Sequence, residues 1–128
     1  MTAQLSHQTP RRILLAEDDD SLRGFLERAL QRAGYSVASY ANGLEAYQHL
    51  QEEPFTLLLT DIVMPEMDGI ELAKLAGEFD PQLKIMFITG FAAVTLKTDE
   101  PMLNDAKVLS KPFHLRDLVA EVDRLLEA

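Results

Sequence analysis

Acidic side chains follow two apolar segments of this chain, at the point where each segment ends. Glu17 and Asp18 come directly after residues 13–16, and Asp61 comes shortly after residues 57–59. Short apolar segments bounded by turn residues are typical of buried strands, and parallel α/β sheets bind ligands just beyond the carboxyl ends of their strands. Carboxylates that share one pocket repel each other, so one must take up a proton or a cation must bind among them. Oxygen ligands in a partly hydrated site suit Mg²⁺.

Thr89 and Lys111 follow two later apolar segments in the same way. If the corresponding strands are neighbours, both residues lie beside the acids. A lysine ammonium neutralises the charge of a phosphoryl group, and a threonine hydroxyl donates a hydrogen bond to it. An aspartate can attack phosphorus and form an acyl phosphate, and in-line transfer needs positioning and charge neutralisation more than acid–base chemistry. This group of residues therefore suits phosphoryl transfer to an aspartate.

Five apolar strand patterns alternate with five helical patterns along the chain. The strands are expected at residues 11–16, 35–40, 55–60, 84–88 and 106–109, and the helices at 21–33, 43–50, 68–77, 92–104 and 114–127. The helix at 92–104 is expected to be short or distorted, because Pro101 is costly inside a helix. Short strands alternating with helices predict an α/β fold with a parallel sheet, helices on both faces and right-handed crossovers.

The chain has the length of one domain. Of its 128 residues, 1–10 are expected to form a flexible tail and 11–128 the domain, and the end of the chain after the last helix favours a free-standing protein. A net charge of −9 argues against general binding of nucleic acid or of anionic membranes. The chain has no cysteine, and it has neither a bilayer-spanning stretch nor a signal-peptide core, so a cytoplasmic location is expected.

Four motifs in order and at the expected spacing carry a family resemblance: ILLAEDD, LLLTDIVMPEMDG, IMFITG and VLSKPF. Over about residues 11–127 the chain resembles the receiver domain of two-component response regulators. The resemblance implies a flavodoxin-like (βα)5 fold, a doubly wound five-stranded parallel sheet with strand order 2-1-3-4-5.

The resemblance also implies a role for each candidate residue. Asp61 corresponds to the phosphoacceptor, Thr89 to the switch hydroxyl, and Lys111 to the lysine that neutralises the phosphate and often precedes a cis proline. The Mg²⁺ ligands correspond to Glu17, Asp18, Asp61 and the backbone carbonyl of Val63.

Within this family the chain is most similar to CpdR-type single-domain regulators, because of FITGFA, LSKPFHLRDLV and the lack of an output domain. This similarity implies a phosphorylation-dependent signalling switch rather than an enzyme that turns over a metabolite. A histidine kinase or a histidine phosphotransferase would supply the phosphoryl group. The face formed by the fourth helix, the fifth strand and the fifth helix would control a partner, and in the CpdR branch that partner is the ClpX–ClpP protease of the cell cycle.

Two positions depart from the family pattern. The first metal-binding acid is Glu17 where Asp is commoner, and its extra methylene changes the metal geometry. Val108 stands where the family usually has an aromatic switch residue, so output is expected to depend more on the irregular segment 90–104. Phe91 and Phe113 are candidate substitutes, although core packing is the favoured role for Phe113.

Three other functions remain open on the sequence. The stretch from Asp18 to Leu22 fits the motif of haloacid-dehalogenase-type phosphohydrolases, which also form an aspartyl phosphate. A flavodoxin-like cofactor carrier would share the fold, but an acidic first loop repels a flavin phosphate. The chain could also be the receiver of a hybrid histidine kinase.

Overall fold

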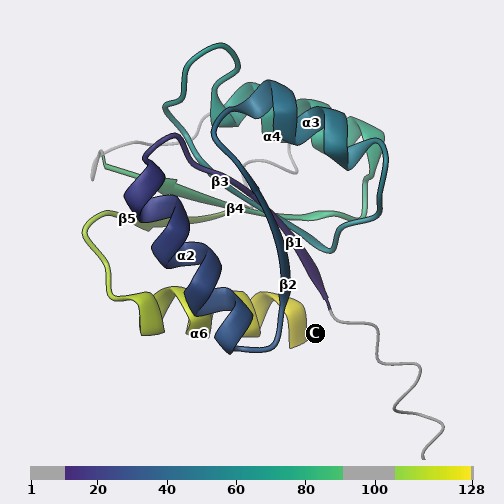
Figure 1. Ribbon diagram of the computed structural model, residues 1–128. Helices are drawn as coiled ribbons and strands as arrows, with labels where there is room; N and C mark the ends of the chain where they lie inside the picture. Colours follow the sequence, from purple (N-terminus) through teal and green to yellow (C-terminus); the bar gives the residue numbers. More distant parts are fainter. Residues whose placement is uncertain (1–10, 91–105, 128) are drawn as a thin grey trace, which may run out of the picture.

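The computed structural model describes residues 11–90 and 106–127, which form a parallel sheet between two layers of helices (Figure 1). Its elements in chain order are β1 (Arg12–Ala16), α2 (Asp20–Arg32), β2 (Ser36–Tyr40), α3 (Gly43–Leu50), β3 (Leu57–Asp61), α4 (Gly69–Phe79), β4 (Lys84–Thr89), β5 (Lys107–Ser110) and α6 (Leu115–Glu127). The predicted tail, the predicted helix at 92–104 and Phe91 lie outside the described residues. Within those residues, no helix is both long and apolar enough to cross a membrane.

The sheet has five strands in the order β2-β1-β3-β4-β5, and every neighbouring pair is parallel. Leu15 of β1 is in register with Leu59 of β3, which in turn is in register with Met86 of β4. All carboxyl ends therefore lie at one edge of the sheet. The predicted fold class and strand order are confirmed.

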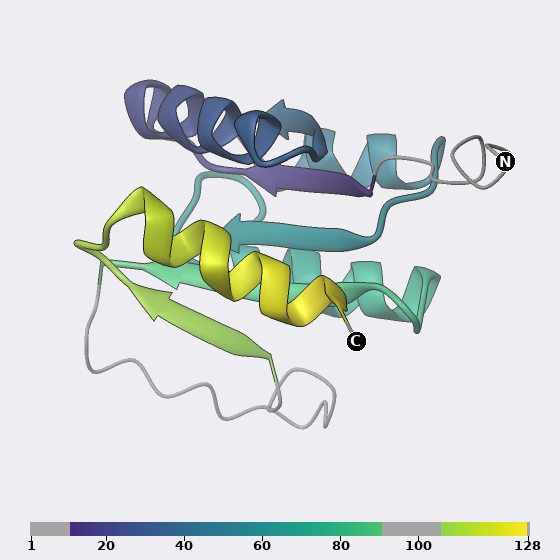
Figure 2. The same cartoon turned by 90° about the horizontal axis from the view of Figure 1, so that it is seen from below.

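Helices cover both faces of the sheet. Figures 1 and 2 show α3 and α4 on one face and α2 beside α6 on the other. Alternate residues of β1 divide between these layers: Leu14 packs in the cluster under α3 and α4, whereas Ile13 and Leu15 pack in the cluster under α2 and α6. Strands buried on both faces explain the near-continuous apolar runs in the sequence.

Side-chain caps fix where the helices begin. The carboxylate of Asp19 accepts a hydrogen bond from the Leu22 N–H at the start of α2. Asn42 and Asp68 cap α3 and α4 in the same way. Each cap satisfies one backbone donor that the helix itself leaves unpaired. Gly34 follows α2 with a φ of +103°, which is the left-handed conformation that glycine favours.

Within residues 11–90 and 106–127, the predicted boundaries of the helices and strands are correct to within two residues. Phe25 of α2 and Leu115 of α6 are large apolar residues that remain 52% and 36% exposed. The fully buried residues of α2 are Leu26 and Leu30, which form the centre of its apolar stripe. Phe25 lies at the edge of this stripe, where the guanidinium of Arg28 packs over its ring at 5.3 Å.

Candidate functional site

Three acids from two neighbouring strands meet at the carboxyl edge of the sheet. Glu17 directly follows β1, and Asp61 is the last residue of β3. The β1–β3 register pairs Ala16 with Thr60, which brings the next residue of each strand together. Glu17 and Asp61 are buried and Asp18 is exposed, and one carboxylate oxygen of each lies within 4.8 Å of the others. The structure thus brings together the three acids that the sequence singled out.

Lys111, which directly follows the edge strand β5, completes this cluster. Its Nζ donates hydrogen bonds to Asp61 Oδ2 at 2.9 Å and to Glu17 Oε1 at 3.2 Å. The backbone N–H of Lys111 donates to the Thr89 carbonyl at 2.6 Å, which links the ends of β4 and β5. The Lys111–Pro112 peptide bond is cis, as the family resemblance implied.

Burial and charge shift the protonation of two members of the cluster. Burial raises the pKa of Glu17 to about 7, and the negative charge of Asp61 adds to this rise. The hydrogen bond from the Asp19 N–H and the Lys111 charge lower the pKa of Glu17 but do not cancel the rise. Burial lowers the pKa of Lys111, but its hydrogen bond to Asp61 and the two carboxylate charges outweigh burial and leave the pKa raised. Lys111 is therefore a firm cation at neutral pH.

The loop after Asp61 folds back over the site. The Val63 N–H donates to Asp61 Oδ1 at 3.2 Å, and the Gly69 N–H donates to the Ile62 carbonyl at 2.8 Å. A Cβ at Gly69 would lie 1.9 Å from the Asp61 carbonyl oxygen, so only glycine fits at the start of α4. Met64 is buried and anchors the middle of the loop in the core. Asp61 is thus fixed from its own strand and from the following helix.

The donor set of the cluster suits a divalent cation. Three carboxylates face one ammonium group, so an excess of negative charge remains when all are ionised. Hard oxygen ligands, one of them exposed to water, are the arrangement that Mg²⁺ prefers. Glu17, Asp18 and Asp61 are the residues that would hold the ion, and the predicted carbonyl ligand belongs to Val63, whose side chain is exposed.

The remaining predicted residues lie at or near the same edge. Thr89 is buried at the end of β4, one residue beyond Ile88, which is in register with Asp61. Val108 is partly buried on β5 and packs against the cluster under α3 and α4. Phe113 packs against the cluster under α2 and α6, which agrees with the core role favoured for it.

The sequence analysis missed one residue that contacts the acid-bearing loop. Arg23 Nη1 donates to the Glu17 carbonyl at 2.9 Å, and Nη2 donates to Asp20 Oδ1 at 2.7 Å. The spacing of Asp20 and Arg23, which places them on one side of a helix, was the signal that could have found it. The contact with Glu17 depends on how the loop folds and has no local signature.

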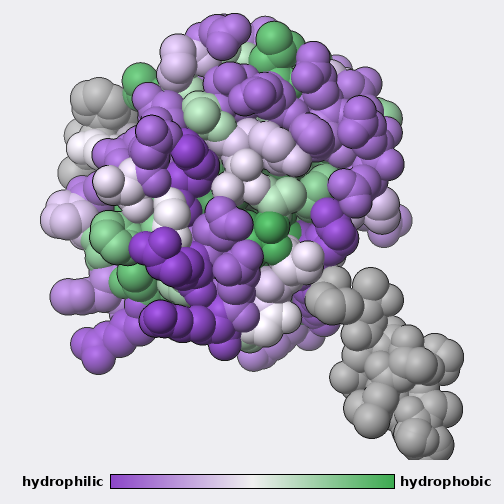
Figure 3. All heavy atoms as spheres, in the orientation of Figure 1, coloured by the Kyte–Doolittle hydropathy of each residue, from purple (hydrophilic) through white to green (hydrophobic). Residues whose placement is uncertain are grey.

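A shallow apolar cavity of about 360 Å³ lies beside Lys111. It is lined by Leu22, Phe25, Lys111, Pro112, Phe113 and Leu115, called here the α2–α6 patch. Figure 3 shows hydrophobic side chains over the start of α2 and the connection from β5 to α6, on a face that is otherwise largely hydrophilic. The exposed side chains of Phe25 and Leu115 both belong to this patch. Apolar surface at this position borders the acidic cluster directly.

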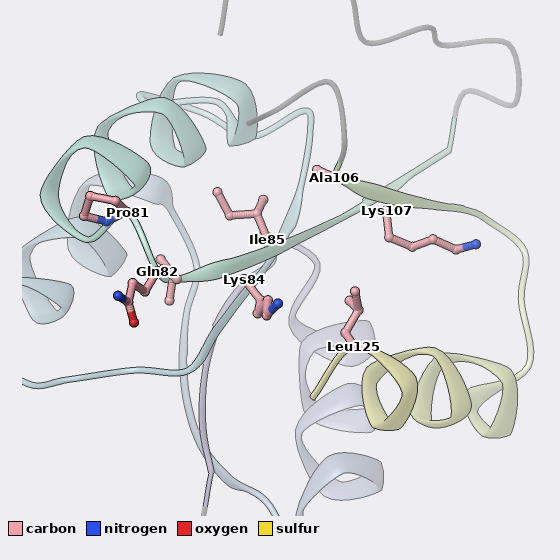
Figure 4. Close-up of a pocket in the computed structure, with 8 residues that line it drawn as sticks. Pro81, Gln82, Lys84, Ile85, Ala106, Lys107 and Leu125 are labelled. Carbon is pink, nitrogen blue, oxygen red and sulfur yellow. The ribbon is translucent and has the colours of Figure 1, made fainter. Parts of the chain in front are cut away.

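A larger cavity of about 550 Å³ lies at the opposite edge of the sheet, at the amino ends of β4 and β5. Lys84 and Lys107 line it together with Leu125 of α6 (Figure 4). None of the candidate site residues lines this cavity. Cavity size therefore does not identify the chemistry of this chain.

Comparison of the sequence with known proteins identifies the family of this chain. The sequence profile of the response regulator receiver domain matches residues 13–123. The chain belongs to this family. Response regulator receiver protein CpdR of Brucella abortus (strain 2308) is 68% identical to this receiver over 118 residues, which are 92% of this chain and 98% of the relative. The resemblance to the CpdR-type branch is therefore confirmed.

Solved structures share the receiver fold. A response regulator receiver protein from Sinorhizobium medicae WSM419 is 33% identical with a TM-score of 0.84, and the match covers 93% of this chain and 96% of that one. The response regulator protein TrrA from Thermotoga maritima, solved in complex with Mg²⁺-BeF, is 28% identical with a TM-score of 0.80. That match covers 91% of this receiver and 99% of TrrA.

Proposed function

We propose that this receiver accepts a phosphoryl group on Asp61 from a histidine kinase or a histidine phosphotransferase and thereby switches the activity of a partner. The observation that carries the proposal is the placement of the buried Asp61 carboxylate beside Lys111 and two further acids. A carboxylate is a competent nucleophile, and the group around it supplies the charge neutralisation that in-line phosphoryl transfer requires.

In the proposed step an Asp61 carboxylate oxygen attacks the phosphorus of a phosphohistidine. The new O–P bond forms as the P–N bond breaks, and the imidazole leaves with the electron pair of that bond. Bound Mg²⁺, held by Glu17, Asp18, Asp61 and the Val63 carbonyl, would neutralise the phosphoryl oxygens. Lys111 moves its hydrogen bond from Asp61 to the phosphoryl group, and the Thr89 hydroxyl donates to a second phosphoryl oxygen.

The α2–α6 patch is the surface on which we propose that the phosphodonor protein docks. Lys111 lines this patch and also contacts Asp61, so a donor seated on the patch brings its histidine close to the acceptor. Exposed large apolar side chains gathered at one place mark an interaction surface more often than scattered ones do. Phe25 and Leu115 supply such side chains here, and the partly buried Leu22 lies between them and the core.

The switch is proposed to act through the ends of β4 and β5. The Lys111 N–H is bonded to the Thr89 carbonyl, so a shift of either residue toward a phosphoryl group moves both strand ends. Lys107, at the other end of β5, lies 3.5 Å from Glu121 of α6 and connects the strand to that helix. We propose ClpX–ClpP as the controlled partner because of the resemblance to the CpdR branch, and we propose the cytoplasm as the location.

The test is the intact mass of the protein after incubation with acetyl phosphate and Mg²⁺. The wild type should gain the mass of one phosphoryl group, whereas Asp61→Asn, which keeps the shape of the side chain, should gain none. Asp117→Asn, which changes an exposed acid in the first turn of α6, should be loaded like the wild type. Equal loading of Asp61→Asn would refute the assignment of the acceptor.

A phosphohydrolase is the competing function. It would use the Asp18 motif, but Lys111 contacts Glu17 and Asp61 rather than the exposed Asp18. This arrangement favours the receiver function. Many turnovers of phosphate release from a small phosphomonoester would favour the phosphohydrolase instead.

A further inference from the structure

Arg23 joins the first turns of α2 to the loop that carries the metal-binding acids. Its guanidinium donates to the Glu17 carbonyl at 2.9 Å and to Asp20 Oδ1 at 2.7 Å. The Arg23 side chain is only 21% exposed, whereas that of its partner Asp20 is 85% exposed. A largely buried guanidinium with two well-formed hydrogen bonds is held in one geometry, because unpaired donors at this depth would be costly.

The contact of Arg23 with the Glu17 carbonyl fixes the orientation of the peptide plane between Glu17 and Asp18. The Glu17 N–H is held by the Tyr40 carbonyl at 3.0 Å, and its carboxylate is held by the Asp19 N–H and by Lys111. The Glu17 carbonyl belongs to the peptide unit that leads into Asp18. Its orientation therefore sets the direction in which the Asp18 side chain leaves the backbone.

We propose that Arg23 is a positioning residue of the divalent-cation site, and that it aims the Asp18 carboxylate at those of Glu17 and Asp61. The inference rests on the proposed function, because it assigns a partner to the cation site described above. Groups that orient metal ligands from outside typically change metal affinity by about 10–100-fold when they are removed.

The charge of Arg23 and its role in orienting the Glu17–Asp18 peptide predict opposite changes in Mg²⁺ affinity when Arg23 is replaced. Removing a cation that is bonded to the acid-bearing loop should, on charge alone, strengthen the attraction of the nearby carboxylates for Mg²⁺. Releasing the Glu17–Asp18 peptide should weaken binding, because the exposed Asp18 would then have to be ordered by the ion itself. The sign of the change in Mg²⁺ affinity therefore separates the two roles.

The experiment is a Mg²⁺ titration of the unphosphorylated full chain, followed by the backbone amide signals of Asp18 and Asp19 in NMR spectra. Arg23→Gln should raise the Kd for Mg²⁺ by about tenfold or more. Arg23→Lys, which keeps the charge and one donor, should fall between Arg23→Gln and the wild type. Arg32→Gln removes the same charge from the last turn of α2 and should leave the Kd within about twofold of the wild-type value. Unchanged or tighter Mg²⁺ binding by Arg23→Gln would overturn the proposal.

A readout without metal separates this inference from the proposed function. The Asp19 N–H donates to Glu17 Oε2, so loss of Arg23 should accelerate hydrogen exchange at Asp19 in the absence of Mg²⁺. If the wild type bound no Mg²⁺, the cation site and the role of Arg23 toward it would both fail. If the wild type bound Mg²⁺ and accepted a phosphoryl group while Arg23→Gln kept the wild-type Kd, only the role of Arg23 would fail.

Discussion

The Lys111 ammonium donates a hydrogen bond to Asp61 Oδ2 at 2.9 Å across the intervening strand β4. The same group lies 3.2 Å from Glu17 Oε1, so one lysine compensates two buried carboxylates. Removing one partner from such a cluster leaves the other charges uncompensated, which costs more than the favourable interaction itself.

Lys111→Met should therefore destabilise the metal-free protein by about 2 kcal/mol, less than for a fully buried pair because Lys111 is partly exposed. Added Mg²⁺ should restore more stability to this variant than it gives to the wild type, because the ion replaces the missing cation. Urea unfolding with and without Mg²⁺ measures both effects. Lys107→Met, at the start of β5 and in a partly exposed ion pair, should change stability by no more than about 0.5 kcal/mol. Equal losses in the two variants would contradict the special role of Lys111.

Stabilisation by Mg²⁺ should depend on pH through Glu17. The pKa of this carboxyl is raised from 4.5 to about 7, so the metal-free folded state binds its proton more tightly than the unfolded chain does. Glu17 thus contributes stability below pH 4.5 that is lost as the pH rises toward 7. A bound cation favours the ionised carboxylate, so the gain in Tm from Mg²⁺ should grow over this window and level off above it.

Thermal unfolding at a series of pH values, with Mg²⁺ or with a chelator, checks this prediction. Glu17→Gln cannot ionise at this position, so its gain in Tm from Mg²⁺ should be smaller and should vary less with pH. A wild-type gain that is constant over the whole range would show that Glu17 does not ionise on Mg²⁺ binding.

Phe25→Ala should slow phosphoryl transfer from a protein donor by about tenfold, as for the loss of one large anchor from an interface. Loading from acetyl phosphate should be unchanged, because the small donor needs no docking surface. Phe79→Ala is a matched control: its ring is 49% exposed, close to the 52% of Phe25, but it lines a different cavity between α3 and α4. The rates can be compared by mass spectrometry, and equal effects of the two variants on donor transfer would remove the support for the α2–α6 patch.

Two glycines at helical positions should respond oppositely to alanine. In an open helix this substitution stabilises by up to about 1 kcal/mol. A Cβ at Gly24 would meet only Arg28 Nη1 at 3.5 Å, so Gly24→Ala should follow the helix rule. A Cβ at Gly43 would lie 2.6 Å from the Met67 carbonyl oxygen, in the loop after Asp61. Gly43→Ala should therefore destabilise by about 1–2 kcal/mol, which chemical unfolding of both variants would measure. A gain of stability in Gly43→Ala would show that the loop around Met67 can move away from the new methyl group without loss of stability.

Much of the fold and the members of the site could be predicted from sequence because their signals are local. The apolar run ahead of Asp61, the cap at Asp68 and the glycine after it each specify structure within a few residues. The convergence of Glu17, Asp61 and Lys111 followed from the rule that ligands bind at the carboxyl edge of parallel sheets, together with the strand order that the family resemblance implied.

What could not be predicted depends on contacts between distant residues or on small differences in orientation. Phe25 lies one position from the fully buried Leu26, and helical periodicity alone does not fix which side of the stripe is covered. Arg23 reaches the Glu17 carbonyl only because the intervening loop turns back on the helix. The raised pKa of Glu17 depends on its complete burial, which no local pattern reports.

The site draws its charged groups from residue 17 to residue 111, and this spread has a consequence for synthesis and folding. A growing chain that has not yet made β5 carries Glu17 and Asp61 without the cation that compensates them. The charges at the carboxyl ends of β1 and β3 are therefore compensated only after Lys111 has left the ribosome. Contacts this distant in sequence slow folding, so a prematurely ended chain should remain open and sensitive to proteases.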